Sequence, residues 1–149
     1  MLALDANLWI AAFDPADVFH ADSVAVFAEA ARFSLPLAGP SLVVLESICA
    51  LARRVGDPSF AHAARAQMGD HPALHLEPIS DDLLAEAVRL GVEHRLRGID
   101  ALYMATARRL GCPLLSWDQE LIDRGGALSP RGWLATIRGD QEQEPAPAG

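Results

Sequence analysis

Short apolar segments alternate with longer segments of helical periodicity along this chain, and this alternation restricts the fold more than any other feature. The apolar segments are residues 2–4, 35–38, 74–76 and 113–116, each too short to be a buried helix. Alternation of this kind implies a parallel sheet, because each strand-to-strand crossover carries a helix that covers one face. We therefore predict an α/β fold, a three-layer α/β/α domain with a short central parallel sheet.

The segments between the expected strands carry helix start and stop signals. Gly39-Pro40 and Gly56-Asp57-Pro58 are expected to break the chain, and Ala127-Leu128 to form an edge strand. Helices are expected at 20–33, from Ser41 to about Arg54, and at 59–68. Further helices are expected from Ser80, with an apolar face of Leu83, Leu84, Ala87, Val88 and Leu90, from about Asp100 to Leu110 after a break at Gly98, and from Gln119 to Arg124.

The C-terminal residues differ in composition from the rest. Trp133, Leu134 and Ile137 are expected to pack back on the body, whereas Gln, Glu, Pro, Ala and Gly dominate beyond Arg138. We predict one domain over residues 1–138 and a disordered acidic tail over 139–149.

The net charge of −8 arises mostly from two places. Three acids lie in the tail and four are the site candidates named below, so 13 of the 20 acids remain against 12 bases. Every base is Arg, whose planar fork suits phosphate. The acidic composition argues weakly against nucleic acid as a partner, but it is compatible with an enzyme whose acids gather in one metal site.

Features of location are also expected from the sequence. Asp5 interrupts the apolar N-terminus and no basic region precedes it, so a signal peptide is not expected, and no apolar run approaches a membrane span. Cys49 and Cys112 lie beside apolar residues without a metal-type partner, so we predict reduced core cysteines in a cytoplasmic protein.

Four acids stand at the ends of apolar segments or inside one: Asp5, Glu46, Asp100 and Asp118. Asp5 follows the first expected strand, and Asp118 follows the strand at 114–115. Ligands of open parallel sheets bind outside the carboxyl ends of the strands, which is where these two acids are expected.

Each acid also has a purely structural interpretation. Asp5 fits a turn residue or a cap for a helix that starts near Asn7. Asp100 fits an N-cap or first-turn acid of a helix that ends at Gly111. Asp118 fits a cap for the helix from Gln119. Glu46 lies in a helix that is apolar almost all round, where a buried carboxylate needs a partner or a cation. Its alternative is a narrow solvent face shared with Ala50 and Arg53.

If the four acids converge, a cation is required. Two carboxylates about 4 Å apart repel by about 4 kcal/mol at an effective dielectric near 20. Clusters of carboxylate oxygens suit Mg²⁺ or Mn²⁺, and such ions bind a phosphodiester and lower the pKa of a water. The residues alone thus favour metal-dependent phosphodiester hydrolysis.

Four blocks of this sequence resemble the blocks of PIN-domain ribonucleases, and their order, spacing and total length resemble VapC-type toxins of toxin–antitoxin pairs. The similarity runs from Met1 to about Ile137, and the Asp-Ala-Leu block with its preceding Arg-Gly is its most specific part. The blocks are Leu4-Asp5-Ala6-Asn7, Leu45-Glu46, Gly98 to Ala107, and Leu114-Leu115-Ser116-Trp117-Asp118.

The resemblance implies a ribonuclease whose Asp5, Glu46, Asp100 and Asp118 bind Mg²⁺ or Mn²⁺. It also implies that Asn7 and Ser116 orient the acids and a water without binding the metal themselves. The family often has Thr where this chain has Ser116, and the hydroxyl is kept. A cognate antitoxin that inserts a peptide near the acids and a homodimer are implied in the same way. The apolar run from Trp9 to Phe13 either forms a docking surface for such a partner or packs into the core.

Two arginines are candidates for contact with the RNA backbone. Arg97 lies three residues before Asp100, and Arg53 lies two turns beyond Glu46 on the same helix face. Pairing with surface acids is the alternative for both, and a surface position is also the simpler interpretation of Asp123. Two other functions stay open: a catalytically inactive PIN-like domain that binds RNA or protein, and a small Mg²⁺-dependent phosphatase.

Overall fold

A computed structural model of the chain describes residues 1–142, which form four strands and eight helices. The strands are β1 (Leu2–Leu4), β2 (Leu37–Pro40), β3 (Leu74–Glu77) and β4 (Leu114–Leu115). The helices are α1 (Ala6–Phe13), α2 (His20–Arg32), α3 (Leu42–Val55), α4 (Pro58–Gly69), α5 (Asp81–His94), α6 (Gly98–Leu110), α7 (Gln119–Gly125) and α8 (Pro130–Glu142). Within this part of the chain, no helix is both long and apolar enough to cross a membrane.

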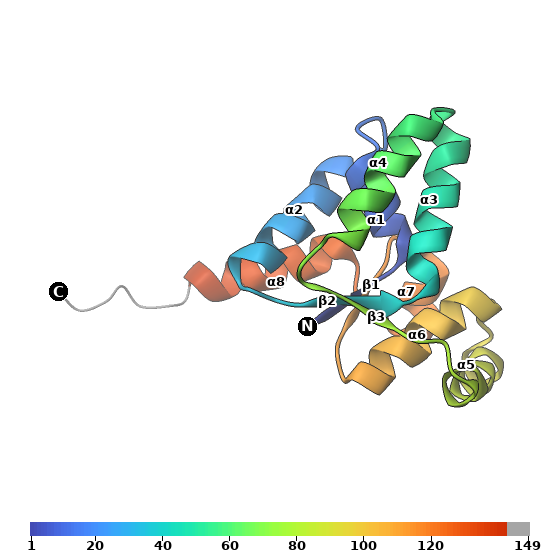
Figure 1. The fold of residues 1–149 in the computed structure, drawn as a ribbon. Coiled ribbons are helices and arrows are strands. Elements are labelled where there is room, and N and C mark those ends of the chain that lie inside the picture. The colour runs from blue at the N-terminus through green and yellow to red at the C-terminus, as the bar shows by residue number, and fades with distance from the viewer. Residues whose placement is uncertain (143–149) are drawn as a thin grey trace.

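The strands pair in parallel in the order β3-β2-β1-β4. Helices α1 to α4 lie on one side of the sheet and α5 and α6 on the other, so the predicted three-layer α/β/α arrangement is confirmed (Figure 1). In the sheet, β2 lies on one side of β1, and β4, the last strand in the chain, lies on its other side. The carboxyl ends of β1 and β4 therefore meet where the strand order reverses, which is the expected place for a site.

Two elements differ from the sequence prediction. β2 begins at Leu37 and includes Gly39 and Pro40, which were expected to break the chain. Gly39 allows a close approach to α3, because a Cβ there would lie 3.2 Å from Cγ1 of Val43 in the first turn of that helix. The predicted edge strand at Ala127-Leu128 is reduced to a single parallel bridge between Leu128 and Leu115.

The core consists of the sheet, the inner faces of the helices around it and the start of α8. Tyr103 on α6 is 1% exposed, and it is among the largest side chains that are fully buried. Trp133, Leu134 and Ile137 pack against the core as predicted. α8 continues to Glu142, past the predicted domain end at Arg138. Residues 143–149 of the predicted tail lie outside the described residues.

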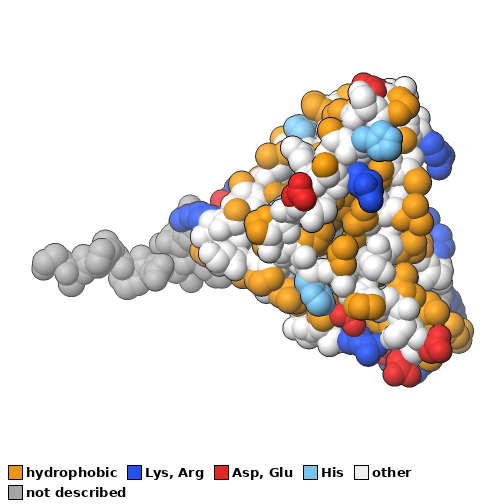
Figure 2. Space-filling view, in the orientation of Figure 1, with side chains coloured by type: hydrophobic (Ala, Val, Ile, Leu, Met, Phe, Trp, Pro, Cys, Tyr) orange, Lys and Arg blue, Asp and Glu red, His pale blue; other side chains and the backbone are white. Residues whose placement is uncertain are grey.

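Two predictions of burial are wrong. Cys49 is exposed on α3, because this helix buries only Val43, Ser47 and Leu51 in full; Cys112 packs at the edge of the core, and both cysteines are free. α5 packs on α6 through Leu83, Ala87 and Leu90, which leaves the predicted core residues Leu84 and Val88 on its outer side. Hydrophobic side chains are spread over the face seen in Figure 2, with charged groups mostly scattered among them.

Candidate functional site

Asp5 is buried, and its carboxylate is held between two side chains. One carboxylate oxygen, Oδ2, accepts hydrogen bonds from Nδ2 of Asn7 at 2.7 Å and from Oγ of Ser116 at 2.5 Å. Asn7 also donates to Ser116, and its own oxygen accepts from the backbone N–H of Trp117. Asn7 comes from α1 and Ser116 from the end of β4, so the two predicted orienting residues fix Asp5 where β1 and β4 end.

Glu46 reaches the site from α3 and is held by a residue from α6. The hydroxyl of Tyr103 donates to Oε2 of Glu46 at 2.9 Å. Glu46 is therefore half-buried, and its carboxylate has a partner within the chain. Tyr103 lies three residues after Asp100, so one helix face carries one acid of the site and positions another.

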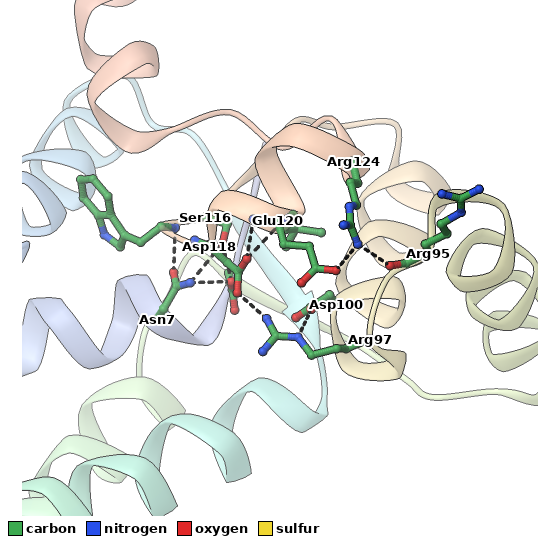
Figure 3. Close-up of polar contacts among 11 residues, drawn as sticks. Asn7, Arg95, Arg97, Asp100, Ser116, Asp118, Glu120 and Arg124 are labelled. Atoms are coloured by element: carbon green, nitrogen blue, oxygen red, sulfur yellow. Dashed lines mark hydrogen bonds and ion pairs between the residues drawn. The ribbon is translucent and has the colours of Figure 1, made fainter.

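Asp100 lies in the first turn of α6, but Arg97 is the N-cap residue, and Asp100 makes no capping hydrogen bond. Its Oδ2 instead accepts from Nε of Arg97 at 2.7 Å. The same guanidinium donates through Nη2 to Oδ2 of Asp118. Figure 3 shows Arg97 between the two carboxylates, so a cation of the chain itself joins two of the four acids.

Asp118 combines a structural role with its place in the site. Its Oδ1 accepts from the backbone N–H groups of Glu120 and Leu121, which caps α7, and the cap interpretation is confirmed. Its own N–H donates to Oγ of Ser116, the group that also holds Asp5. Because Oδ1 caps the helix and Oδ2 binds Arg97, both oxygens of Asp118 are in use in this conformation.

The electrostatics show that the acids lie near one another. Burial raises the pKa of Asp5 to about 6, and the charges of Glu46 and Asp100 add to the rise, although the Ser116 hydroxyl opposes it. Burial also raises the pKa of Glu46 and of Asp100, with a further contribution from a neighbouring carboxylate in each case. Burial opposes the shift at Asp118, but the N–H groups that it caps and Arg97 lower its pKa.

The residues present fit a hard divalent cation in chemistry, although they do not yet form a chelating group. No three acids, histidines or cysteines within residues 1–142 are placed to hold an ion together. The donors are all carboxylates, which Mg²⁺ and Mn²⁺ prefer, and three of the four have a raised pKa. Each of these three uses only one of its two oxygens in the hydrogen bonds described above. Displacement of Arg97 would free Oδ2 of Asp118 as well.

The other residues suggested by the sequence lie in different places. Arg97 is at the acids, whereas Arg53 is exposed on α3 with no contact to any of them. The neighbouring Arg54 pairs instead with Asp14 and Asp17. Asp123 accepts from Gln119 on the surface of α7, as the simpler interpretation expects.

Comparison with known proteins decides the family. The PIN domain model matches residues 2–127, which is most of the chain. The chain belongs to the PIN domain family. The PIN match spans the elements that carry all four acids, and the PIN fold that the sequence suggested is confirmed. A comparison with curated protein sequences gave no match.

Solved structures share the PIN fold at low sequence identity. Mycobacterium tuberculosis VapC20, described as a toxin that cleaves the sarcin–ricin loop, has a TM-score of 0.67 and 24% identity over 80% of this chain and 91% of its own. PAE2754 from Pyrobaculum aerophilum has a TM-score of 0.67 and 23% identity, covering 93% of this chain and 89% of its own. A toxin–antitoxin complex from Klebsiella pneumoniae has a TM-score of 0.61 and 18% identity, covering 87% and 98%.

Three residues near the acids have roles that sequence reasoning did not assign. Tyr103 holds Glu46, and its hydroxyl within the otherwise apolar run 101–105 was a signal for this. Trp117 stacks on Phe19 with ring centroids 4.2 Å apart, beside Asn7 and Asp118. No sequence spacing predicts this last contact, because the two rings are about a hundred residues apart in the chain.

Proposed function

We propose that this PIN-domain protein is an endoribonuclease that depends on Mg²⁺ or Mn²⁺ and is the toxin of a type II toxin–antitoxin pair in the cytoplasm. The observation that carries the proposal is the convergence of Asp5, Glu46, Asp100 and Asp118 from four separate elements at the switch point of the sheet. The PIN family model and the likeness to VapC20 support the choice of RNA as the substrate.

The four carboxylates are proposed to hold the cation. A bound Mg²⁺ or Mn²⁺ binds the phosphodiester oxygens and lowers the pKa of a water. Ser116 and Asn7 keep Asp5 in one orientation, and Tyr103 does the same for Glu46. A rigid set of ligands lowers the cost of binding both the ion and the scissile phosphate.

Arg97 is proposed to exchange partners when substrate binds. In the present structure it compensates the charge of Asp100 and Asp118, but its side chain is 60% exposed and has a planar fork that suits a phosphate. If a cation bound by the acids took over this charge compensation, the guanidinium would be free to contact the RNA backbone. Arg53 has no contact to the acids, and we keep it as a second, more distant contact for the backbone.

Partner proteins are proposed on two surfaces. Trp9 is buried in the core, yet Trp9, Ala12 and Phe13 also line a groove of about 540 Å³ between α1, α2 and α4, to which we assign the antitoxin. This assignment is supported by the toxin–antitoxin complex among the similar structures.

The outer side of α5 is proposed as the homodimer contact. Leu84, Val88 and Val92 recur every four residues there and are 45%, 67% and 78% exposed, so they form an apolar stripe on the solvent side of the helix. Light scattering at micromolar concentration should give a dimer for the wild type and a monomer for Val88→Glu. A monomeric wild type would contradict the homodimer.

The experiment that tests the function compares substrates and metals. The purified chain is incubated with RNA and with a phosphomonoester, each in Mg²⁺, in Mn²⁺ and in a chelator. Cleavage of RNA only with metal is the expected result. RNA binding without cleavage would favour the inactive PIN-like domain, and hydrolysis of the phosphomonoester alone would favour the phosphatase.

A further inference from the structure

A hollow of about 550 Å³ adjoins the acids at Asp118, which is one of its lining residues. Asn7 and Asp118 form its boundary with the site, and its volume is within the range of small-ligand sites. The remaining lining residues come from the loop after α1 and from three other elements: Ile10, Asp14, Ala16, Asp17, Val18, Phe19, Arg54 and Trp117. If the scissile phosphate of an RNA lies at the acids, the nucleotide next to it lies beside this hollow, because Asp118 belongs to both places.

The aromatic part of the hollow is rigid. Trp117 stacks on Phe19 at an interplanar angle of 11°, and its Nε1 donates to Oγ of buried Ser23 at 2.9 Å. The guanidinium of Arg131 lies 5.7 Å from the Trp117 ring centre. The Trp117 backbone N–H donates to Asn7, so the aromatic pair is tied to the residue that orients Asp5. Phe19 is only partly buried, and Val18 beside it is 84% exposed.

The charges of the hollow favour a base over a phosphate. Asp14 and Asp17 hold Arg54 between them, and Asp118 adds a third carboxylate at the boundary. Arg54 and Arg97, the partner of Asp118, offset two of these three charges, so the hollow gives a phosphate group little net attraction. The carboxylate oxygens can accept the N–H groups on the edge of a nucleobase.

We propose that this hollow binds the unpaired nucleobase next to the scissile phosphate, stacked on Phe19 as a third ring after Trp117. The proposal rests on the proposed ribonuclease function. Base-on-aromatic stacking contributes about 1–3 kcal/mol per base and tolerates every base. The hollow thus selects single-stranded RNA, because a paired base cannot turn into it.

The test asks whether the loss of the Phe19 ring and the loss of one RNA base affect the same binding contact. A fluorescent single-stranded RNA of eight nucleotides is titrated by anisotropy in Ca²⁺, together with eight versions that each lack one base. Wild type, Phe19→Leu and Phe19→Tyr are compared, with Phe33→Leu as the control, because Phe33 is also partly exposed but lies at the far end of α2. Circular dichroism melts establish that each variant is folded.

We expect one abasic position to weaken binding to the wild type about tenfold, and the same position to cost Phe19→Leu almost nothing. Phe19→Leu should bind intact RNA about tenfold more weakly, and Phe19→Tyr and Phe33→Leu should bind like the wild type. Equal abasic losses in wild type and Phe19→Leu would overturn the subsite, because the two changes would then act independently. If Phe19→Leu instead weakened binding of an antitoxin peptide about tenfold and left RNA binding unchanged, the hollow would be assigned to the antitoxin.

A measurement on the wild type alone gives an answer even if Phe19→Leu does not fold. RNA that carries 4-thiouridine is photocrosslinked to the protein, and the linked peptide is identified by mass spectrometry. Crosslinks to residues 14–19 or to Trp117 support the subsite, and crosslinks confined to other segments contradict it. A wild type that neither binds nor cleaves RNA would refute the proposed function itself, whereas cleavage without coupling to Phe19 refutes only the subsite.

Discussion

Replacement of Asp5 by Asn should change how the stability of the metal-free protein depends on pH. Asp5 is 6% exposed, and its pKa is raised from 3.8 to about 6, mainly by burial. The folded state therefore binds a proton at Asp5 more tightly than the unfolded chain does. Between about pH 4 and pH 6 the folded state carries more protons, so the free energy of unfolding falls as pH rises through this window.

The size of the effect follows from the pKa difference. A shift of this size corresponds to about 3 kcal/mol, at about 1.36 kcal/mol per pKa unit. This stability is fully present below the unfolded pKa near 4 and is lost above pH 6. Asn at this position cannot ionise but can still accept hydrogen bonds from Asn7 and Ser116. Relative to wild type, Asp5→Asn should gain roughly 2–3 kcal/mol between pH 4 and pH 7.5.

Urea unfolding in a chelator, followed by circular dichroism at several pH values, measures this difference. Glu46 and Asp100 have raised pKa values in both proteins, so the difference between variant and wild type reports mainly on Asp5 and its coupling to them. Asp118→Asn is a matched control, because the pKa of Asp118 is lowered and its loss should cost stability at neutral pH. A difference between Asp5→Asn and wild type that stays constant from pH 4 to pH 7.5 would refute the reasoning.

Three further predictions concern the residues around the acids. Arg97→Gln should bind Mn²⁺ about tenfold more tightly by calorimetry, because about 1.4 kcal/mol is no longer spent on displacing a half-exposed guanidinium from two carboxylates. Arg124→Gln, which loses a pair with Glu120 and a hydrogen bond to the Arg95 carbonyl but no contact to the four acids, should bind like the wild type. Equal affinities in all three proteins would contradict the exchange. Tyr103→Phe should lower kcat with little change in KM and cost roughly 1–2 kcal/mol of stability, because it frees Glu46; an unchanged kcat would show that this hydrogen bond serves the fold alone. Saturating Mg²⁺ or Mn²⁺ should raise the melting temperature of the wild type by roughly 5–10 °C, and less at acidic pH where protons compete for the carboxylates; an unmoved melt would refute a site formed by the folded state.

Much of the fold was predictable because its signals are local. The short apolar strands and the helix signals at Ser80 and Gly111 are contained in a few consecutive residues, and the structure has elements at these places. Burial was harder to predict, since it depends on what lies opposite each helix. Leu84 and Val88 have the spacing of a core face, but α6 covers only the other side of α5.

The acids of the site were predictable as a set, whereas their partners were not. Asp5 and Asp118 follow strands, and the position of a residue after a strand of a parallel sheet indicates where it lies. Arg97 was placed near Asp100 by sequence alone, but its bridge to Asp118 depends on how α6 packs beside α7. The stacking of Phe19 on Trp117 depends in the same way on the loop after α1. Such contacts join distant segments, and a single sequence has no local pattern for them.

The central claim is that the four carboxylates bind the metal ion that hydrolyses RNA, and Asp100→Asn tests it most directly. Asp100 caps no helix, and Asn can still accept from Arg97, so the variant should fold like the wild type but lose an anionic ligand. RNA cleavage and Mn²⁺ affinity are measured side by side in both proteins. The account predicts a folded variant with no detectable cleavage and clearly weaker Mn²⁺ binding. Wild-type cleavage by Asp100→Asn in Mg²⁺ or Mn²⁺ would contradict it.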